Sequence, residues 1–410
     1  MRLKQEIIRL TAILIVANTA VFAKNESAHE QVQVPQCLAA KIRVSHQVLA
    51  ENKQFKIIDL LSSDINNLTQ LADQVQCGRF VNVSHRLSGT AWVDKQHGAQ
   101  ILLQNSMLRS PRSTQFNRDS YEIKHQEEVK AALKKVVAAN IWDTLTHLTY
   151  FYDRSARTDS GVHTAYWLKD IFEDMAYEYG RNDTATFFVE TGQYKQPSLV
   201  TVIGKGLDED AVVLGAHMDT LDSLDDHIAG SHPMPGAGDD GSGSASLMEM
   251  TRILLSSKTT FKRPIYIIWY AAEERGLVGS QHVVQHFKTE KIRVKAAIQF
   301  DMTGYRVNPD DPTMWVFTDY TDEVLSDFIT RLIKTYIHVP VAYSQCGYGC
   351  SDHVSWTKEG IPTAFPCESN FKNHNPNIHT SLDTMDHLSL EHMTNFSKLA
   401  LAFAIELASG

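Results

Sequence analysis

The sequence predicts an α/β protein in which a mainly parallel, partly mixed central sheet carries helices on both faces, with a small domain in front of it. From about Tyr121 onward, short apolar runs rich in β-branched residues alternate with amphipathic stretches of helical period. Before that point the chain is polar and this alternation is missing. Alternation of strands and helices is typical of a largely parallel sheet that is covered on both faces.

The elements of the larger domain follow one another along the chain. The predicted strands span residues 211–215, 264–271, 296–300 and 314–317, and the predicted helices span residues 243–255, 277–287, 323–337 and about 390–407. In the N-terminal part, only an apolar run at residues 55–61 and a short helix near residues 68–75 stand out. We found no repeats or low-complexity tracts.

The first 23 residues have the pattern of a secretory signal peptide. A basic stretch with Arg2, Lys4 and Arg9 precedes an apolar run, and small residues follow at positions 21 and 23. A membrane anchor is the alternative, but the run is too short to span a bilayer comfortably. We therefore expect a secreted protein, extracellular or periplasmic in transit, without stable membrane association.

Residues 24–119 are predicted to be a propeptide and residues 120–410 the catalytic domain. The boundary lies in a basic stretch with Pro and Ser at residues 109–115, typical of an exposed and cleavable linker. An accessory domain that stays attached is the alternative. The segment shows no constellation of chemically reactive residues. As a propeptide it is a candidate inhibitor of its own enzyme.

Charge and cysteine content narrow the function further. The net charge of −9 and the lack of a basic stripe argue against a nucleic-acid partner. Five cysteines suit an oxidising compartment, and Cys346 and Cys350 are a disulfide candidate, with a metal site as the alternative. Cys37 and Cys77 are a second candidate pair, which leaves Cys367. Nothing in the sequence suggests more than a monomer.

Acidic residues and histidine follow three predicted strands at the point where each strand ends. In open α/β sheets, ligands bind beyond the carboxyl ends of the strands. A single such residue is more often a hydrogen-bonded cap, but several carboxylates at one edge repel one another unless a cation joins them. Imidazole with carboxylate and no thiolate suits zinc. The residues concerned are His217 and Asp219, Glu273 and Glu274, and Asp301, with Asp239, Asp240 and His379 in loops.

Several stretches together resemble the bacterial leucyl aminopeptidases, which are secreted enzymes with two zinc ions and the zinc-exopeptidase (phosphorylase/hydrolase-like) fold. The resemblance covers roughly residues 120–410 in unbroken order. It is carried by the stretches Gly-Ala-His217-Met-Asp219-Thr, Pro-Gly-Ala-Gly-Asp239-Asp240-Gly-Ser-Gly, Ala-Ala-Glu273-Glu274-Arg-Gly-Leu-Val-Gly-Ser, Phe-Asp301-Met302-Thr, Cys346-Gly-Tyr348-Gly-Cys350-Ser-Asp-His and Asn-Pro-Asn-Ile378-His379-Thr.

This resemblance implies two zinc ions per catalytic domain and a role for each matching residue. Asp239 would bridge the two ions, with His217 and Glu274 on one side and Asp301 and His379 completing the other. Glu273 would be the general base for a water held between the metals, and Asp219 would orient His217. The peptide bond between Asp239 and Asp240 is expected to be cis. The expected substrates are the free amino ends of peptides or proteins.

The resemblance also implies an apolar pocket for the side chain of the first substrate residue. Its walls would include Met302, Cys350, Phe371 and Ile378, and the Tyr348 hydroxyl is a candidate to stabilise the oxyanion. Cys367 stands where relatives carry an aromatic wall residue, so a hydrophobic, leucine-like preference is expected rather than leucine alone. Gly238 stands where relatives often have a third aspartate, which is not a metal ligand.

Three other functions were weighed. A carboxypeptidase or dipeptidase of the same fold needs a basic group for the substrate carboxylate, and Arg275 is the nearest candidate. A glutaminyl-cyclase-like acyltransferase would not need all five ligands. A binding protein that has lost activity would lack ligands, and none is missing.

Overall fold

The computed structural model describes residues 28–88, 93–108, 121–221, 233–257 and 259–410. The predicted signal peptide and the predicted cleavage linker lie outside these residues. None of the described helices combines the length and the hydropathy that a membrane span needs.

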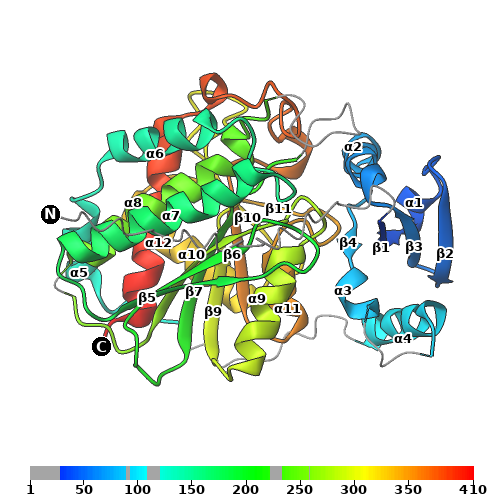
Figure 1. Cartoon of the computed structure of the whole chain (residues 1–410). Coiled ribbons are helices and arrows are strands. Elements are labelled where there is room, and N and C mark those ends of the chain that lie inside the picture. Colours follow the sequence, from blue (N-terminus) through cyan, green and yellow to red (C-terminus); the bar gives the residue numbers. More distant parts are fainter. Residues whose placement is uncertain (1–27, 89–92, 109–120, 222–232, 258) are drawn as a thin grey trace, which may run out of the picture.

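The N-terminal part forms a unit of its own, drawn in blue and cyan in Figure 1. Four strands make a sheet in the order β2-β3-β1-β4, and β1 pairs antiparallel with both β3 and β4. The strands are β1 (His29–Pro35), β2 (His46–Glu51), β3 (Phe55–Leu61) and β4 (Val81–Asn82), and the helices are α1 (Gln36–Ala39), α2 (Ile65–Val75), α3 (Ser84–Leu87) and α4 (Lys95–Leu108). α2 includes the predicted helix near residues 68–75. Its apolar side packs on β1 and β3 in a small separate core.

The larger domain is built on an eight-stranded mixed sheet in the order β11-β10-β12-β9-β7-β8-β6-β5. Neighbouring strands β12 and β9, β9 and β7, β7 and β8, and β10 and β11 are parallel, whereas β10/β12, β8/β6 and β6/β5 are antiparallel. The strands are β5 (Thr184–Val189), β6 (Ser198–Ile203), β7 (Ala211–His217), β8 (Ile265–Tyr270), β9 (Val294–Gln299), β10 (Met314–Phe317), β11 (Val341–Ser344) and β12 (Thr363–Cys367).

Helices cover both faces of this sheet (Figure 1). One face carries the main hydrophobic core, and the opposite face carries a smaller core. The first layer contains α5 (Gln126–Leu133), α6 (Ala138–Tyr150), α7 (Asp159–Glu178), α8 (Ser242–Ser256), α10 (Glu323–Leu332) and α12 (Leu390–Ala408), and the second contains α9 (Val278–Thr289) and α11 (His353–Lys358). α12 is buried along almost its whole length because it packs on α8, α6 and α5.

The predicted α/β fold with a mixed sheet is therefore confirmed. The four predicted strands are β7, β8, β9 and β10, and their bounds differ from the prediction by two residues or fewer. The predicted helix at residues 323–337 is α10 followed by a wider turn, Ile333–Ile337. β5, β6, β11 and β12 were not predicted individually.

The strand order brings the site together. β7 lies between β9 and β8 and is parallel to both, so the carboxyl ends of these three strands meet at one edge. His217 is the last residue of β7, and Glu273, Glu274 and Asp301 lie two to four residues beyond the ends of β8 and β9.

Candidate metal centre and active site

His217, the last residue of β7, makes one corner of the site. Its Nε2 lies 2.9 Å from Oδ1 of Asp239 and 3.6 Å from Oδ1 of Asp301, which follows β9. All three side chains are buried. One potential ligand atom from each lies within 4.8 Å of the others, so the three atoms can converge on a single cation.

His379 makes the second corner together with Glu274. Its Nε2 lies 3.0 Å from Oδ2 of Asp239 and 3.2 Å from Oε2 of Glu274, and these atoms form a second convergent set. Asp239 thus offers one carboxylate oxygen to each set. The grouping differs from the one that the resemblance implied, because His217 groups with Asp301 and Glu274 groups with His379.

The donor atoms fit zinc. Each set has one imidazole nitrogen and carboxylate oxygens, without thiolate, and zinc binds such atoms at about 2.0–2.2 Å. Burial raises the pKa of Asp239, but the two histidines on either side outweigh it and hold that pKa well below the usual range. The shared carboxylate therefore favours its charged form, which is the form that binds a cation.

Asp240 fixes the backbone around these ligands. Its carboxylate accepts hydrogen bonds from the amides of His217 at 3.1 Å, Gly243 at 2.9 Å and Met302 at 3.1 Å. Three segments of the site are thereby tied to one side chain. The peptide bond between Asp239 and Asp240 is cis, as the resemblance implied.

Asp383 supports the same loop from the opposite side. Its carboxylate accepts from the amides of Gly238 and Asp239, both at 2.9 Å. A Cβ at Gly238 would lie 2.9 Å from Oδ1 of Asp383, so glycine is the residue that leaves room for this support. Asp383 was not predicted as a site residue, and it lies four residues after His379 in a polar loop.

Asp219 has a wider role than the one that was expected. Its carboxylate lies 3.6 Å from Nδ1 of His217, but that nitrogen is closer to the backbone oxygen of Asp219, at 3.1 Å. The carboxylate also accepts hydrogen bonds from the backbone amides of Glu273 at 3.0 Å and Glu274 at 3.2 Å. Asp219 therefore orients the adjacent glutamates as well as the imidazole.

Glu273 is buried beside the second ligand set. Burial raises its pKa well above the usual range, although Arg79 and His217 oppose that shift. Its Oε2 has no hydrogen-bond partner among the described residues. A buried glutamate with a raised pKa and an oxygen that accepts no hydrogen bond is well suited to accept a proton from a reacting group.

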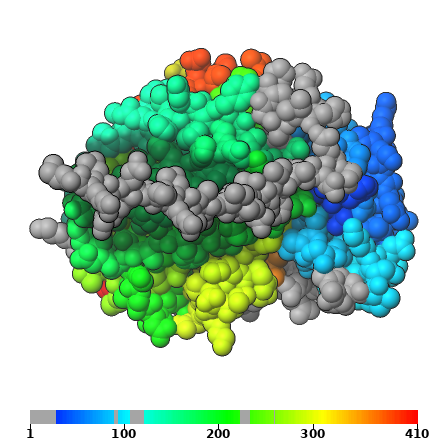
Figure 2. Space-filling model, viewed as in Figure 1, coloured from blue at the N-terminus to red at the C-terminus, as the bar shows by residue number. Residues whose placement is uncertain are grey.

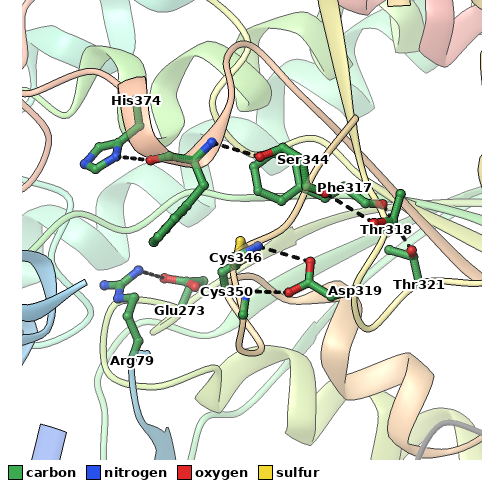
Figure 3. The surroundings of a disulfide bond; sticks show 12 residues. Arg79, Glu273, Phe317, Thr318, Asp319, Thr321, Ser344, Cys346, Cys350 and His374 are labelled. Atoms are coloured by element: carbon green, nitrogen blue, oxygen red, sulfur yellow. Dashed lines mark hydrogen bonds and ion pairs between the residues drawn. A yellow bond between two sulfur atoms is a disulfide. The ribbon is translucent and has the colours of Figure 1, made fainter. Parts of the chain in front are cut away.

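An apolar cavity opens beside the ligands, and Figure 3 shows part of its wall. All six predicted substrate-contacting residues are on its lining, and so are residues that were not predicted to line it, among them Phe317, Cys346 and Phe365. The six are Met302, Tyr348, Cys350, Cys367, Phe371 and Ile378. Asp239, Asp301 and His379 line the same cavity, so an apolar group inside it lies next to the candidate metal ligands.

The disulfide loop forms one wall of this cavity. Cys346 and Cys350 are bridged, and so are Cys37 and Cys77 in the N-terminal unit. Tyr348, between the two bridged residues of the loop, contacts Phe371 edge to face, with ring centroids 5.8 Å apart.

The N-terminal unit reaches into the site, which corrects the expectation that it holds no chemically relevant group. Asp73 of α2 places Oδ2 2.5 Å from Nδ1 of His379. Arg79 places Nη2 2.8 Å from Oε2 of Glu274 and Nη1 3.9 Å from Oε2 of Glu273 (Figure 3). No local pattern marked either residue, because each acquires its role only when the unit docks on the larger domain.

A buried ion pair anchors the docked unit. Glu30 of β1 is fully buried and lies 3.1 Å from Nη2 of Arg275, the residue that follows Glu274. It also accepts from the Tyr194 hydroxyl at 2.5 Å and from the Asn82 amide. Arg275, the group that a carboxypeptidase of this fold would need for its substrate, is therefore engaged with the N-terminal unit.

Known proteins with similar sequences and structures fit this geometry. Residues 199–404 match peptidase family M28. Leucine aminopeptidase 1 of Coccidioides posadasii is 38% identical over 299 residues, which cover 70% of this chain and 75% of that protein.

Two solved structures cover almost the whole chain. The LapA aminopeptidase of Legionella pneumophila is 67% identical with a TM-score of 0.89, over 94% of this chain and 99% of that one. LapB of the same organism is 40% identical with a TM-score of 0.82, over 93% and 99%. The chain therefore belongs to peptidase family M28, as a metallo-aminopeptidase.

Proposed function

We propose that this chain is a secreted aminopeptidase with two zinc ions that removes hydrophobic first residues from peptides. The observation that carries the two-metal centre is Asp239, whose two carboxylate oxygens face the His217 set and the His379 set. A carboxylate shared in this way is the bridge that a pair of metals needs. His217 and Asp301 would hold one zinc ion, and Glu274 and His379 the other.

Zinc would supply a Lewis acid for the scissile carbonyl and would lower the pKa of a water to about 7. Glu273 is the proton carrier of this chain. It takes a proton from the attacking water and delivers it to the leaving amine. Its amide and that of Glu274 are both held by Asp219, which keeps the base and the neighbouring ligand in fixed relative positions.

The substrate's first side chain would occupy the apolar cavity, and its free amine would lie near Asp301 on the same lining. A blocked amine loses that interaction, which confines cleavage to the first residue. The Tyr348 hydroxyl, on the wall of the cavity, is the candidate donor to the oxyanion. Cys367 at the end of β12 leaves more room than an aromatic residue would, so the preference is hydrophobic and leucine-like.

Residues 24–119 would be an inhibitory propeptide, after a signal peptide of residues 1–23. Arg79 supports this proposal because it ion-pairs with the base, Glu273, and with the ligand Glu274. It lines both the apolar cavity and a small cavity beside Glu273, so it lies where a substrate would meet the base. Cleavage between residues 109 and 118 would release it.

Hydrolysis of leucine p-nitroanilide before and after limited proteolysis tests this function. We expect activity to rise on cleavage, to disappear with a chelator and to return with zinc. N-acetyl-leucine p-nitroanilide is the matched control substrate, and its cleavage would contradict an exopeptidase. Unchanged activity after removal of the N-terminal segment would contradict an inhibitory role for it.

A further inference from the structure

Arg79 lies directly against one of the two ligand sets. Its Nη2 is 2.8 Å from Oε2 of Glu274 and 3.4 Å from Nε2 of His379. These are the same two atoms that converge with Asp239 on a cation. The guanidinium thus shares a carboxylate oxygen with the metal position.

The guanidinium is held in this place by the fold of the N-terminal unit. Gly78, just before Arg79, has φ +130°, and a Cβ there would lie 2.9 Å from Cγ of Pro35. Cys77, one residue earlier, is bridged to Cys37. The Arg79 side chain is only 14% exposed. The backbone that carries Arg79 is thus constrained, and the docked unit keeps most of its side chain out of solvent.

The effect of such a cation on a neighbouring metal is repulsive. Two positive charges a few ångströms apart repel strongly when water is largely excluded, and Glu274 and His379 are almost fully buried. The donor strength of Glu274 also falls, because its Oε2 already accepts a hydrogen bond from Arg79. Both effects act on one ligand set, since the described hydrogen bonds and ion pairs of Arg79 reach Glu274 and His379 but neither His217 nor Asp301.

Asp73 acts on the same set in the opposite direction. It contacts Nδ1 of His379, the imidazole nitrogen that faces away from the other ligands. A carboxylate in that position fixes the tautomer that leaves Nε2 available and makes the imidazole a stronger donor. The N-terminal unit therefore brings one group that opposes a metal and one that favours it.

We propose that Arg79 acts as a cation surrogate that weakens zinc binding at the set formed by Asp239, Glu274 and His379. The Arg79 contact and the loading of this one metal position then oppose each other, Asp73 offsets part of this effect, and the His217 set keeps its affinity. The proposal rests on the proposed two-zinc function. In the uncleaved chain, zinc would bind more weakly at this set than at the His217 set. Full loading of this set would then depend on release of the N-terminal unit.

The experiment titrates the uncleaved, metal-stripped chain with Zn²⁺ against a chromophoric chelator. Arg79→Met removes the cation, Asp73→Asn removes the anion, and Arg43→Met, which removes a charge from an exposed position of the same unit, is the matched control. We expect Arg79→Met to raise the weaker of two zinc affinities by about tenfold or more. Asp73→Asn should lower it by about tenfold. Arg43→Met should leave both affinities unchanged.

Opposite signs are the decisive result, because both substitutions loosen the docked unit. If both raised the weaker affinity equally, undocking and not the guanidinium would be the cause, and the proposal would be overturned. Equal affinities for Arg79→Met and the unaltered chain would overturn it as well. Arg79→Gln, which keeps a hydrogen-bond donor, serves if Arg79→Met fails to fold. A cleaved, fully loaded enzyme without aminopeptidase activity would refute the proposed function and leave these affinities as they are.

Discussion

His85 of the N-terminal unit and His282 of α9 face each other where the unit meets the larger domain, with ring centroids 4.8 Å apart. Nδ1 of His85 and Nε2 of His282 have no hydrogen-bond partner among the described residues. Burial lowers the pKa of both rings, for His85 to about 3, and for His85 the neighbours His282 and Arg86 lower it further. The contact therefore requires both rings to be neutral.

A fall in pH should therefore weaken the docking of the N-terminal unit on the larger domain. The docked pKa of His85 lies below its undocked value of about 6.5, so its contribution to docking is complete well above pH 6.5. It is lost as the pH falls from 6.5 towards 3, by about tenfold in the docking equilibrium per pH unit. His282 adds to the same trend.

Hydrogen exchange of residues 28–88 at pH 7.5 and 5.5, corrected for intrinsic rates, measures this loosening. In His85→Gln the pH dependence should shrink, whereas His46→Gln, on β2 of the same unit, should keep it. Identical pH dependence in His85→Gln and the unaltered chain would refute the prediction.

Replacement of the proposed base should separate proton transfer from metal binding. Glu273 belongs to neither convergent ligand set, and Gln has the same shape but cannot accept the proton. In the cleaved enzyme, Glu273→Gln should lower kcat by about 10²–10⁴-fold, which is the usual contribution of a general base. Zinc content, measured by elemental analysis, should not change. Near-normal turnover would remove Glu273 from this role.

Cys367 should set the width of the apolar cavity. It is 5% exposed at the end of β12 and belongs to a cluster with Phe317 and Phe365. Cys367→Phe would fill the space beside them and should reduce the kcat/KM ratio of phenylalanine to leucine p-nitroanilide by about tenfold or more, since one methylene in a hydrophobic pocket changes discrimination by about 10–200-fold. Cys367→Ser, of similar volume, is the control. An unchanged ratio for Cys367→Phe would place the residue outside the specificity pocket.

The sequence was most informative where chemistry follows a regular element. His217 and Asp301 could be found because buried strands are easily recognised and their carboxyl ends meet in a parallel sheet. Glu273 and Glu274 follow a third such strand. The grouping of the candidate ligands into two convergent sets could not be predicted, because it depends on side-chain directions at the strand ends and in a distant loop.

Asp73 and Arg79 could not be predicted as site residues from a local sequence pattern. Asp73 lies on a short amphipathic helix, where an acidic residue is usually a solvated one. Its position against His379 arises from contacts between segments about 300 residues apart. Only Gly78, with a conformation that few other residues adopt, hints that the chain is constrained there.

Asp319 should position the disulfide loop that carries Tyr348. Asp319 lies two residues after the end of β10. Its carboxylate accepts hydrogen bonds from the backbone amides of Cys346 at 3.1 Å and Gly347 at 2.6 Å (Figure 3). Asn offers one oxygen in place of two, so Asp319→Asn leaves one of these amides without its acceptor. The loop should then hold the cavity wall less firmly.

The expected result of Asp319→Asn in the cleaved enzyme is a KM for leucine p-nitroanilide raised about tenfold, as for loss of one charge-assisted hydrogen bond of roughly 1.5 kcal/mol. kcat should fall by a smaller factor, because Tyr348, the candidate donor to the oxyanion, lies on the same loop, although Asp319 makes no described hydrogen bond to Glu273 or to the candidate metal ligands. Asp310→Asn, in an exposed loop, is the matched control and should leave both constants unchanged. An unchanged KM would mean that Asp319 does not hold the cavity wall that binds the first side chain.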